Sequence, residues 1–475
     1  MTETDLRRLS PALAKYLDEY LFCCGHTQTF GHLGTYVRGL LSDLKRKTCE
    51  PIALKAGTPV RTLQEFLRDH VWSFQQARDF LQGHAATLLP RLPKDELGNV
   101  GLLDETSVAK TGDKTPGAAR QYLGCLGKVD NGIVTVHIGV CKGTFKTLLD
   151  ADLYLPKEWA ADRKRCRAAG IPDSVVHRPK WQIALEQLDR AKKNGITLDW
   201  LTFDEGYGAC PGFLFGLDDN QQAFVGEVPR SFSCLALTRQ GQRPADKVKG
   251  RKAEDVVRSC VVFKSQAWRV LRLPRQSQED QVWRVKAARV WLHSAAGWSE
   301  GSYWLIWASN DETGEEKFFL SNAPTDASVE VLVRVAFRRW NVEHCFRTVK
   351  RELGFTHFEG RHYVALMRHM TLCLITLGFV AEHTERLREK KSGSNDGASV
   401  PSDGRGVPQL AQTPARHERS DAQAGCHQLP PGPERHRPDL QEAKESDHQR
   451  SEKTSPTSPK KKKTICYLPQ VALSC

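Results

Sequence analysis

The stretch Leu198-Asp-Trp-Leu-Thr-Phe-Asp204 is a short apolar run that ends in an acid, and Glu205-Gly-Tyr-Gly208 follows it directly. A second run of the same kind, Val100-Gly-Leu-Leu-Asp104, lies earlier in the chain. Short apolar runs bounded by turn residues predict buried strands. Acids at strand ends beside glycine-containing turns are where α/β folds place chemistry. The two runs therefore predict an α/β fold with Asp104 and Asp204 as candidate site residues.

The sequence around these two runs predicts further strands and helices. Gly132 to Val140 alternates as a buried strand does, and Lys180 to Lys193 has the spacing of a helix. A β-rich segment follows at 226–325, inside the α/β pattern, which favours an inserted subdomain. Its expected strands are Val256 to Phe263, Trp283 to Leu292 and Tyr303 to Trp307.

The predicted division of the chain has five parts. An all-helical region at 1–95 precedes the first α/β part at 96–225, the β-rich insertion at 226–325 and a helical second part at 326–390. In 391–475 there is no Trp or Phe, and prolines and polar residues dominate. Such a tail buries too little apolar surface to offset its ordering entropy, so disorder is predicted. A shift of reading frame would produce the same abrupt change.

The bulk composition points to a basic protein of the cell interior. Lys and Arg number 69 against 56 Asp and Glu, for a net charge of +13. Such an excess suits a polyanion-binding surface but does not prove one. The 14 cysteines lack zinc-ribbon spacing, the N-terminus lacks a secretory signal, and the apolar stretch from Met370 to Ala381 fits a buried helix better than a membrane span. We expect a reduced, cytosolic protein without a membrane partner.

The segment from Pro51 to Leu67 is a candidate helix-turn-helix. Ala53 lets two helices approach, Gly57 suits the turn four residues later, and a second helix begins near Thr58-Pro59. Arg61 and Gln64, with Thr62, would then lie on the exposed face of a recognition helix. An ordinary helical hairpin with a solvated polar face fits the same residues slightly better, because the pattern is short and permissive.

A third acid, Glu343, lies in the cation-rich run from Phe337 to Phe355. On a helix, Arg339, Glu343, Arg347 and Lys350 share one face, because side chains three, four and seven residues apart align. Oxygen ligands from three acids are what Mg²⁺ takes, and two such ions can stabilise both oxygens of a phosphoryl transfer. The alternative is a set of helix caps and a helix laced with ion pairs.

The run Arg339-Trp-Asn-Val-Glu343-His-Cys-Phe-Arg-Thr-Val-Lys350 strongly resembles the tyrosine-arginine-glutamate-lysine signature of insertion-sequence transposases in the DDE superfamily. The arginine and lysine stand four before and seven after the glutamate, as in that signature. The tyrosine position holds Ala336, with Phe337 beside it, so no role of that tyrosine carries over.

Two other stretches resemble the same group. Leu103-Asp104-Glu-Thr-Ser-Val-Ala-Lys-Thr-Gly112, with Arg120-Gln-Tyr-Leu-Gly124 and Gly127-Lys-Val-Asp-Asn131, is similar to its first-aspartate region. Phe203-Asp204-Glu-Gly-Tyr-Gly208 is similar to its second-aspartate motif. The resemblance extends from about residue 30 to about residue 385 and does not reach the tail.

The resemblance implies an RNase H-like mixed sheet flanked by helices and interrupted by the β-rich insertion. It also implies that Asp104, Asp204 and Glu343 hold Mg²⁺, for which Mn²⁺ can substitute, and that the enzyme cuts transposon ends and joins their 3′-hydroxyls to target DNA. The implied partners are double-stranded DNA, as terminal inverted repeats and target, and a second copy in a homodimer. The expected DNA contacts are Arg339, Lys350, Arg347, Arg120, Arg61 and Gln64.

Two alternatives remain at this point. A catalytically inactive DNA-binding remnant or repressor would keep end recognition, and the unusual tail favours it. A general metal-dependent nuclease would cut DNA without the repeats. The presence of all three acids favours the transposase.

Overall fold

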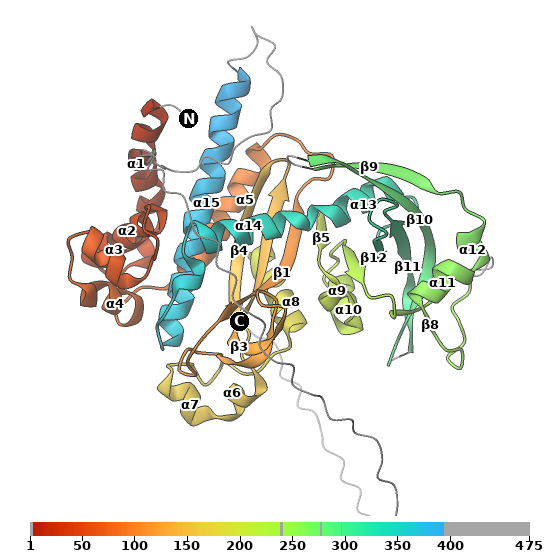
Figure 1. The fold of residues 1–475 in the computed structure, drawn as a ribbon, viewed down its shortest axis with the longest axis horizontal. Helices are drawn as coiled ribbons and strands as arrows, with labels where there is room; N and C mark the ends of the chain where they lie inside the picture. The colour runs from red at the N-terminus through yellow and green to blue at the C-terminus, as the bar shows by residue number, and fades with distance from the viewer. Residues whose placement is uncertain (1–2, 238–240, 276–277, 296, 394–475) are drawn as a thin grey trace, which may run out of the picture. The chain divides into compact units, whose positions relative to one another are not determined.

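The computed structural model describes residues 3–237, 241–275, 278–295 and 297–393, all within one compact unit. Two β-sheets with helices packed around them form this unit (Figure 1). The predicted mixed α/β class is therefore confirmed at this level. The segment expected to be disordered lies, from residue 394 onward, outside the described residues.

The first sheet is built around β1 (Val100–Ala109), which lies between an antiparallel and a parallel neighbour. Its antiparallel neighbour is β3 (Lys128–Lys142), and its parallel neighbour is β5 (Trp200–Thr202). The remaining strands, β2 (Ala119–Leu123) and β4 (Phe145–Leu153), both pair with β3. The strand predicted at 132–140 is confirmed within β3. Because β1 has neighbours on both edges and cover on both faces, almost all of its side chains are buried.

The structure corrects the expected position of Asp104 at a strand end. β1 continues for five residues beyond this acid, to Ala109, in register with β3. The polar residues Thr106 and Ser107 hid the extension, because they break the apolar run although both are buried. Asp104 therefore leaves the sheet from the middle of a strand.

The second sheet is antiparallel throughout and begins directly after the first. A backbone hydrogen bond from Glu227 N to Phe203 O, 3.0 Å long, fastens its first strand beside β5. Its strand order is β6-β12-β11-β10-β7-β8, with β9 paired to β10. The strands are β6 (Val225–Val228), β7 (Ser233–Ala236), β8 (Arg251–Lys252), β9 (Arg269–Arg275), β10 (Gln278–Ser294), β11 (Gly297–Ser309) and β12 (Glu316–Ser321).

One strand predicted in this region is wrong. Residues 256–263 form parts of two helices, α11 (Ala253–Ser259) and α12 (Val261–Lys264). The β-branched valines favoured a strand, but Ala253, Val256 and Val257 are the buried residues of α11, and their spacing is that of a helix face. The strands predicted at 283–292 and 303–307 lie within β10 and β11.

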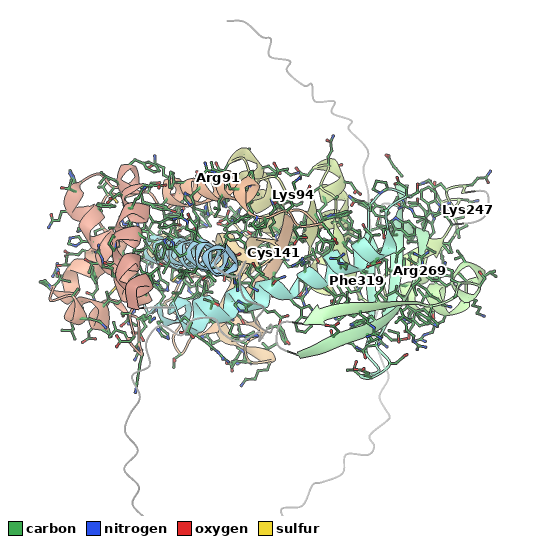
Figure 2. The ribbon with its side chains drawn as sticks, turned by 90° about the horizontal axis from the view of Figure 1, so that it is seen from above. Arg91, Lys94, Cys141, Lys247, Arg269 and Phe319 are labelled. Atoms are coloured by element: carbon green, nitrogen blue, oxygen red, sulfur yellow. The ribbon has the colours of Figure 1, made fainter. Side chains whose placement is uncertain are left out.

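Helix α13 (Val329–Arg338) joins the second sheet to the first. Its Phe337 ring lies 4.9 Å from the ring of Trp283 and 5.8 Å from that of Phe319. Figure 2 shows Phe319 beside this helix, with Arg269 of β9 and Lys247 of the loop between β7 and β8 further out. On its other side, the carbonyl of Ala336 accepts a hydrogen bond from Thr202 of β5. The helix thus fixes the second sheet next to the edge strand of the first.

The remaining helices lie N-terminal to β1, between β4 and β6, and C-terminal to α13. Residues 3–91 are largely helical, as predicted, and the helix predicted at 180–193 is confirmed. The helices are α1 (Glu3–Asp18), α2 (Thr27–Leu41), α3 (Cys49–Lys55), α4 (Val60–Arg68), α5 (Phe74–Leu88), α6 (Lys157–Ala161), α7 (Arg163–Ala168), α8 (Lys180–Lys193), α9 (Glu205–Gly208), α10 (Pro211–Asp219), α14 (Trp340–Arg351) and α15 (Tyr363–Gly393), with 3-10 turns at Leu21–Cys23, Leu89–Arg91 and Phe355–His357.

The long helix α15 lies between the N-terminal helices and the first sheet, and contacts both (Figure 1). Among the described residues it is the one helix long and apolar enough to cross a membrane, yet 83% of its apolar window is buried inside the protein. The buried helix predicted around 370–381 is therefore confirmed. Burial of this length of apolar surface makes α15 the common support of both regions.

Arg368 ties α15 to the N-terminal helices. Its guanidinium donates hydrogen bonds to four backbone carbonyls at the end of α4 and in the following loop, those of Phe66, Leu67, His70 and Trp72, at 3.3, 3.1, 2.8 and 2.6 Å. It also lies over the Trp72 ring, 4.7 Å from the centroid. Carbonyls that follow a helix lack partners within it, so the guanidinium satisfies groups that would otherwise be buried without hydrogen bonds.

Replacing this guanidinium should loosen the N-terminal helices. We expect Arg368→Met to lower the free energy of unfolding by about 3 kcal/mol, because the buried carbonyls lose their donors. Urea denaturation followed by circular dichroism measures the change. The exposed control Arg167→Met should shift it by less than about 0.5 kcal/mol. Equal effects of the two substitutions would contradict this role of Arg368.

The pair of His84 and Glu382 predicts a pH-dependent part of the stability. The hydrogen bond between them is 2.9 Å long and raises the pKa of His84 against the opposing effect of burial. A raised histidine pKa stabilises the fold below the unfolded value of about 6.5, and this stabilisation is lost as the pH rises through the folded value. His84→Gln should therefore cost about 1 kcal/mol more at pH 5.5 than at pH 9, measured by urea denaturation. His26→Gln, at an exposed site, should show no such difference.

Candidate active site

The parallel pairing of β1 and β5 brings the two aspartates to one place. Leu102 lies opposite Thr202 in the register, so Asp104 and Asp204 each follow two residues later. Phe203, which is fully buried, anchors the end of β5 in the core. The expectation that these two acids leave adjacent strands at the same level agrees with this register.

Asp204 also begins a helix. Its carboxylate Oδ1 accepts hydrogen bonds from the backbone N–H groups of Gly206 and Tyr207, at 3.1 and 3.3 Å, as an N-cap of the short helix α9. This N-cap fixes the carboxylate at the end of β5. One oxygen is occupied by the cap, while no hydrogen bond within the described residues is made by Oδ2.

Asp104 is the most buried of the three acids, with 9% of the residue exposed. Burial, and to a lesser degree the nearby Asp204 carboxylate, raise the pKa of its carboxyl to about 7 against the opposing effect of Arg339. Its Oδ1 accepts a hydrogen bond from the backbone N–H of Glu105 at 2.7 Å. A carboxylate held beside another in a poorly solvated place favours a bound cation, because the cation compensates both charges.

Arg339 connects the third acid to the first. Its Nη1 donates to Asp104 Oδ2 at 2.9 Å, and its Nη2 lies 3.4 Å from Glu343 Oε1. The guanidinium is itself mostly buried, and Arg339 forms the joint between α13 and α14. Because the Arg339 guanidinium contacts both carboxylates, the Asp104 and Glu343 side chains lie close to each other on its two sides. Asp104 therefore lies near each of the other two acids: the strand register places it close to Asp204, and Arg339 bridges it to Glu343.

The donor set suits a hard cation. Carboxylate oxygens are the ligands that Mg²⁺ prefers. Within the described ranges, no group of three or more His, Cys, Asp or Glu side chains lies close enough together to hold a metal ion. Arg339 forms ion pairs with both Asp104 and Glu343, so its charge partly neutralises the two carboxylates. The chemistry of the residues fits a divalent ion, while their present contacts are those of an arginine-bridged cluster.

The acids next to the two aspartates point elsewhere. Glu105 forms an ion pair with Lys180 of α8, with Nζ and Oε1 2.7 Å apart. Glu205 is exposed at the start of α9. Neighbours on a strand face opposite sides of a sheet, and Glu105 follows this rule. Among the described residues, neither Glu105 nor Glu205 forms an ion pair with Arg339.

Two uncharged groups near the acids were not singled out by the sequence. The Tyr207 hydroxyl is buried without a hydrogen-bond partner among the described residues. Burial raises its pKa, and the charges of Glu105, Asp104 and Asp204 add to the effect, so the hydroxyl lies near all three. Its position in the Gly-Tyr-Gly turn after Asp204 was the available signal.

His137 lies opposite Asp104 in the β1–β3 register. Its ring packs 5.1 Å from that of Phe346 and 5.5 Å from that of Phe355. Burial lowers its pKa to about 3, with Lys350 contributing, so the imidazole is neutral. The neutral ring of His137 is an uncharged neighbour of Asp104, which helps to explain why the Asp104 carboxyl is poorly solvated. Only the strand register, which the sequence does not give, reveals this neighbour.

The six expected DNA contacts lie in different surroundings. Arg339 is engaged with the acids, and Lys350 lies partly buried, 5.8 Å from the Phe346 ring centroid, with its pKa lowered by burial. Arg347 on α14 and Arg120 on β2 are both exposed. These four residues therefore range from the centre of the acid cluster to open surface.

Arg61 and Gln64 are exposed on α4, at a separate place. The turn before α4 contains Gly57 at φ +65°, where a side chain would be strained, and Ala53 is fully buried between helices. Arg61 forms an ion pair with Glu65 one turn later, at 2.6 Å. The helix pair α3–α4 thus has the local form expected of a helix-turn-helix, and it packs on α2 and α15.

Comparison with known proteins places the chain. Residues 19–291 match the family of DDE superfamily endonucleases, and this match includes Asp104 and Asp204. The chain belongs to this family. It is 26% identical over 361 residues to a protein of Microchaete diplosiphon described as a probable transposase for insertion sequence element IS701, a match that covers 74% of this chain and 83% of the relative. The predicted resemblance to insertion-sequence transposases is confirmed.

Among solved structures, the chain is similar to a piggyBac transposase described in a synaptic complex with hairpin DNA. The TM-score is 0.39 and the sequence identity 10%, and the match covers 76% of this chain and 66%, just under two thirds, of that chain.

The cap made by Asp204 predicts different stabilities for two variants of this residue. Asp204→Asn keeps an N-cap and removes a negative charge beside Asp104, so its unfolding temperature without metal should equal or exceed that of the wild type. Asp204→Ala loses the cap and should cost about 1 kcal/mol. Calorimetry in the presence of a chelator measures both. A lower stability of the asparagine variant than of the alanine variant would contradict the described role of this side chain.

Proposed function

We propose that this chain is a metal-dependent DNA transposase. The observation that carries the proposal is the position of Asp104, which lies near Asp204 at the end of β5 and is bridged to Glu343 of α14 by Arg339. Membership of the DDE superfamily endonucleases and the similarity to a probable insertion-sequence transposase support it.

In this proposal the first sheet and its helices are an RNase H-like core. The core consists of 96–225 and 326–390, the second sheet at 226–325 is an insertion, and 1–95 is a DNA-binding region. The parallel pairing of β1 with β5 and the position of α14 beside them support this assignment. The tail at 391–475 has no assigned role.

The three acids would hold two Mg²⁺ ions, or Mn²⁺ in their place. Such ions stabilise charge on the attacking and leaving oxygens of phosphoryl transfer. Asp204 is held in place by its N-cap, and Asp104 is held in a poorly solvated position by the strand and by His137. Arg339, released from the carboxylates, and Lys350 are positioned to bind phosphates next to the cut.

Two phosphoryl transfers follow from this arrangement. In the first, a water oxygen bonds to phosphorus at the transposon end, the bond to the 3′ oxygen breaks, and a 3′-hydroxyl is left. In the second, this 3′ oxygen bonds to a phosphorus of target DNA and displaces the 3′ oxygen of the target strand. Each step forms one phosphorus–oxygen bond and breaks one, so no oxidant or energy-rich cofactor is needed.

The substrate would be double-stranded DNA, as terminal inverted repeats and target. The net charge of +13 suits binding to phosphates, and the exposed face of α4 with Arg61 and Gln64 would contact the repeats. Two transposon ends require two sites, so we propose a homodimer in the synaptic complex. The relative's description as a probable transposase supports the same substrate class.

Substitution of each acid tests the proposal. Asp104→Asn, Asp204→Asn and Glu343→Gln should each lower the rate of cleavage of a labelled terminal-repeat duplex in Mg²⁺ or Mn²⁺ by about 10³-fold or more. Binding of the duplex should stay within about threefold of the wild type, because removing a negative charge does not weaken phosphate contacts. A chelator should abolish cleavage by the wild type.

The matched control is Glu205→Gln, which removes an exposed acid adjacent to Asp204 and should retain cleavage. Duplex binding without cleavage or joining in either metal would favour the inactive remnant or repressor instead. Equal cleavage of DNA without the repeats would favour a general nuclease. Full activity of all three acid variants would exclude the proposed site.

A further inference from the structure

A basic cavity lies away from the acids, at the far end of β1. It has a volume of about 630 Å³. Three segments distant in the sequence form it: the loop after α2, the loop after β1, and the turn after α14. Its charged lining residues are Lys45, Arg46, Lys110, Lys114, Glu359 and Arg361.

The walls of this cavity are fastened to one another. Lys47 is buried, and its Nζ donates to the carbonyls of Leu40, at 2.7 Å, and of Glu352. Its backbone N–H donates to Nδ1 of His357 at 3.0 Å. Lys110 Nζ donates to the carbonyl of Phe358, which joins the loop after β1 to the same turn. Hydrogen bonds therefore hold the backbone of the cavity walls in place, and this backbone carries the cationic side chains.

The cavity has an excess of unneutralised positive charge. Its only acidic lining residue, Glu359, already forms an ion pair with Arg46. Lys45, Lys114 and Arg361 are exposed. Within the part of the chain that the structure describes, Lys45 and Arg361 form no ion pair. Lys114 pairs only with the neighbouring Asp113, at 3.7 Å. Several cations facing one concave space suit an anion with several charges.

The turn at 357–361 also forms one wall of a second cavity. This cavity, of about 290 Å³, is lined on its other side by Gln64 and Arg68 of α4. The shared wall makes the basic cavity adjacent to the candidate recognition helix. A polyanion bound along α4 and extending past the 357–361 turn would therefore reach the basic cavity.

The geometry of β1 sets the separation between this cavity and the acids. Lys110 follows Asp104 by six residues along an extended strand, which spans about 20 Å at about 3.3 Å per residue. Phosphates along one DNA strand are spaced about 3.4 Å apart along the helix axis. The cavity is therefore about 20 Å from the acids, which corresponds to about six base pairs of a duplex whose axis runs parallel to β1.

We propose that the basic cavity formed by the loops at 42–48 and 110–115 and the turn at 356–361 binds the DNA backbone about six nucleotides from the cut. Its occupants are consecutive phosphates of the duplex between the segment on α4 and the scissile bond. The inference rests on the proposed function, which supplies DNA as the substrate. It adds residues that fix the distance between the recognised sequence and the cut.

A triple variant tests the proposal by removing the exposed cations, in Lys45→Ala, Lys114→Ala and Arg361→Ala combined. Binding of a terminal-repeat duplex without divalent metal is measured by fluorescence anisotropy over a range of salt. We expect affinity to fall about 10-fold or more near 0.15 M salt. The slope of log affinity against log salt should fall in magnitude by about 0.9 for each phosphate contact removed.

The matched control removes the same charge elsewhere, with Lys193→Ala, Lys249→Ala and Lys264→Ala combined. These three lysines are exposed and lie on α8, on the loop before β8 and on α12. Circular dichroism confirms folding of both variants. The control should lose less than about threefold in affinity. If both variants lost the same affinity and slope, the effect would be that of net charge, and the proposal would be overturned.

Replacing single DNA phosphates by an uncharged analogue shows which phosphates the basic cavity contacts. Methylphosphonates placed singly along the duplex should weaken wild-type binding at positions five to eight nucleotides from the cut, and should add little to the defect of the cavity variant. Equal weakening of both proteins at those positions would overturn the proposed location. Cavity-dependent binding without cleavage in Mg²⁺ or Mn²⁺ would contradict the transposase but support the cavity. No binding by the wild type would overturn both.

Discussion

The pairing of β1 with β5 is the constraint on which the site depends. Three residue pairs in parallel register set Asp104 level with Asp204, and no local sequence feature could do so, because the strands are far apart in the chain. The pairing has an electrostatic cost, since it places two carboxylates together in a poorly solvated place. Arg339 offsets part of that cost. In the proposed enzyme, the same unfavourable charge would favour binding of a cation.

A second set of polar contacts holds the helical region on this core. Arg368 of α15 satisfies carbonyls after α4, and Lys47 satisfies carbonyls of α2 and α14. Both are cations buried against backbone oxygens. Their hydrogen bonds stabilise the contact between the helices and also fix the relative orientation of the helices. Apolar packing along α15 would permit sliding, whereas these donors fix the register. The candidate recognition helix and the basic cavity are thereby positioned relative to β1.

The sequence predicted those features whose signals are local. Apolar runs gave β1 and β5, helical spacing gave α8, and the cation-rich run around Glu343 gave α14. It failed where tertiary contacts decide: valines at 256 and 257 face a core from a helix, and buried Thr106 and Ser107 extend β1 beyond its apolar part. The neighbours of the acids, Tyr207 and His137, depend on strand register and turn direction. These are properties of the assembled sheet, which a pattern along the chain does not contain.

The order of the acids along the chain has a consequence for biosynthesis. Glu343 and Arg339 follow the whole second sheet, so a nascent chain that has folded its first sheet exposes two aspartates without their partners. Domains fold as units while synthesis continues toward the C-terminus. In the proposed enzyme, a polypeptide released early would carry the helical DNA-binding region but no complete set of acids. Such a product would also lack α15, which supports the N-terminal helices, so neither the acids nor the DNA-binding region would be in place until α15 has been synthesised.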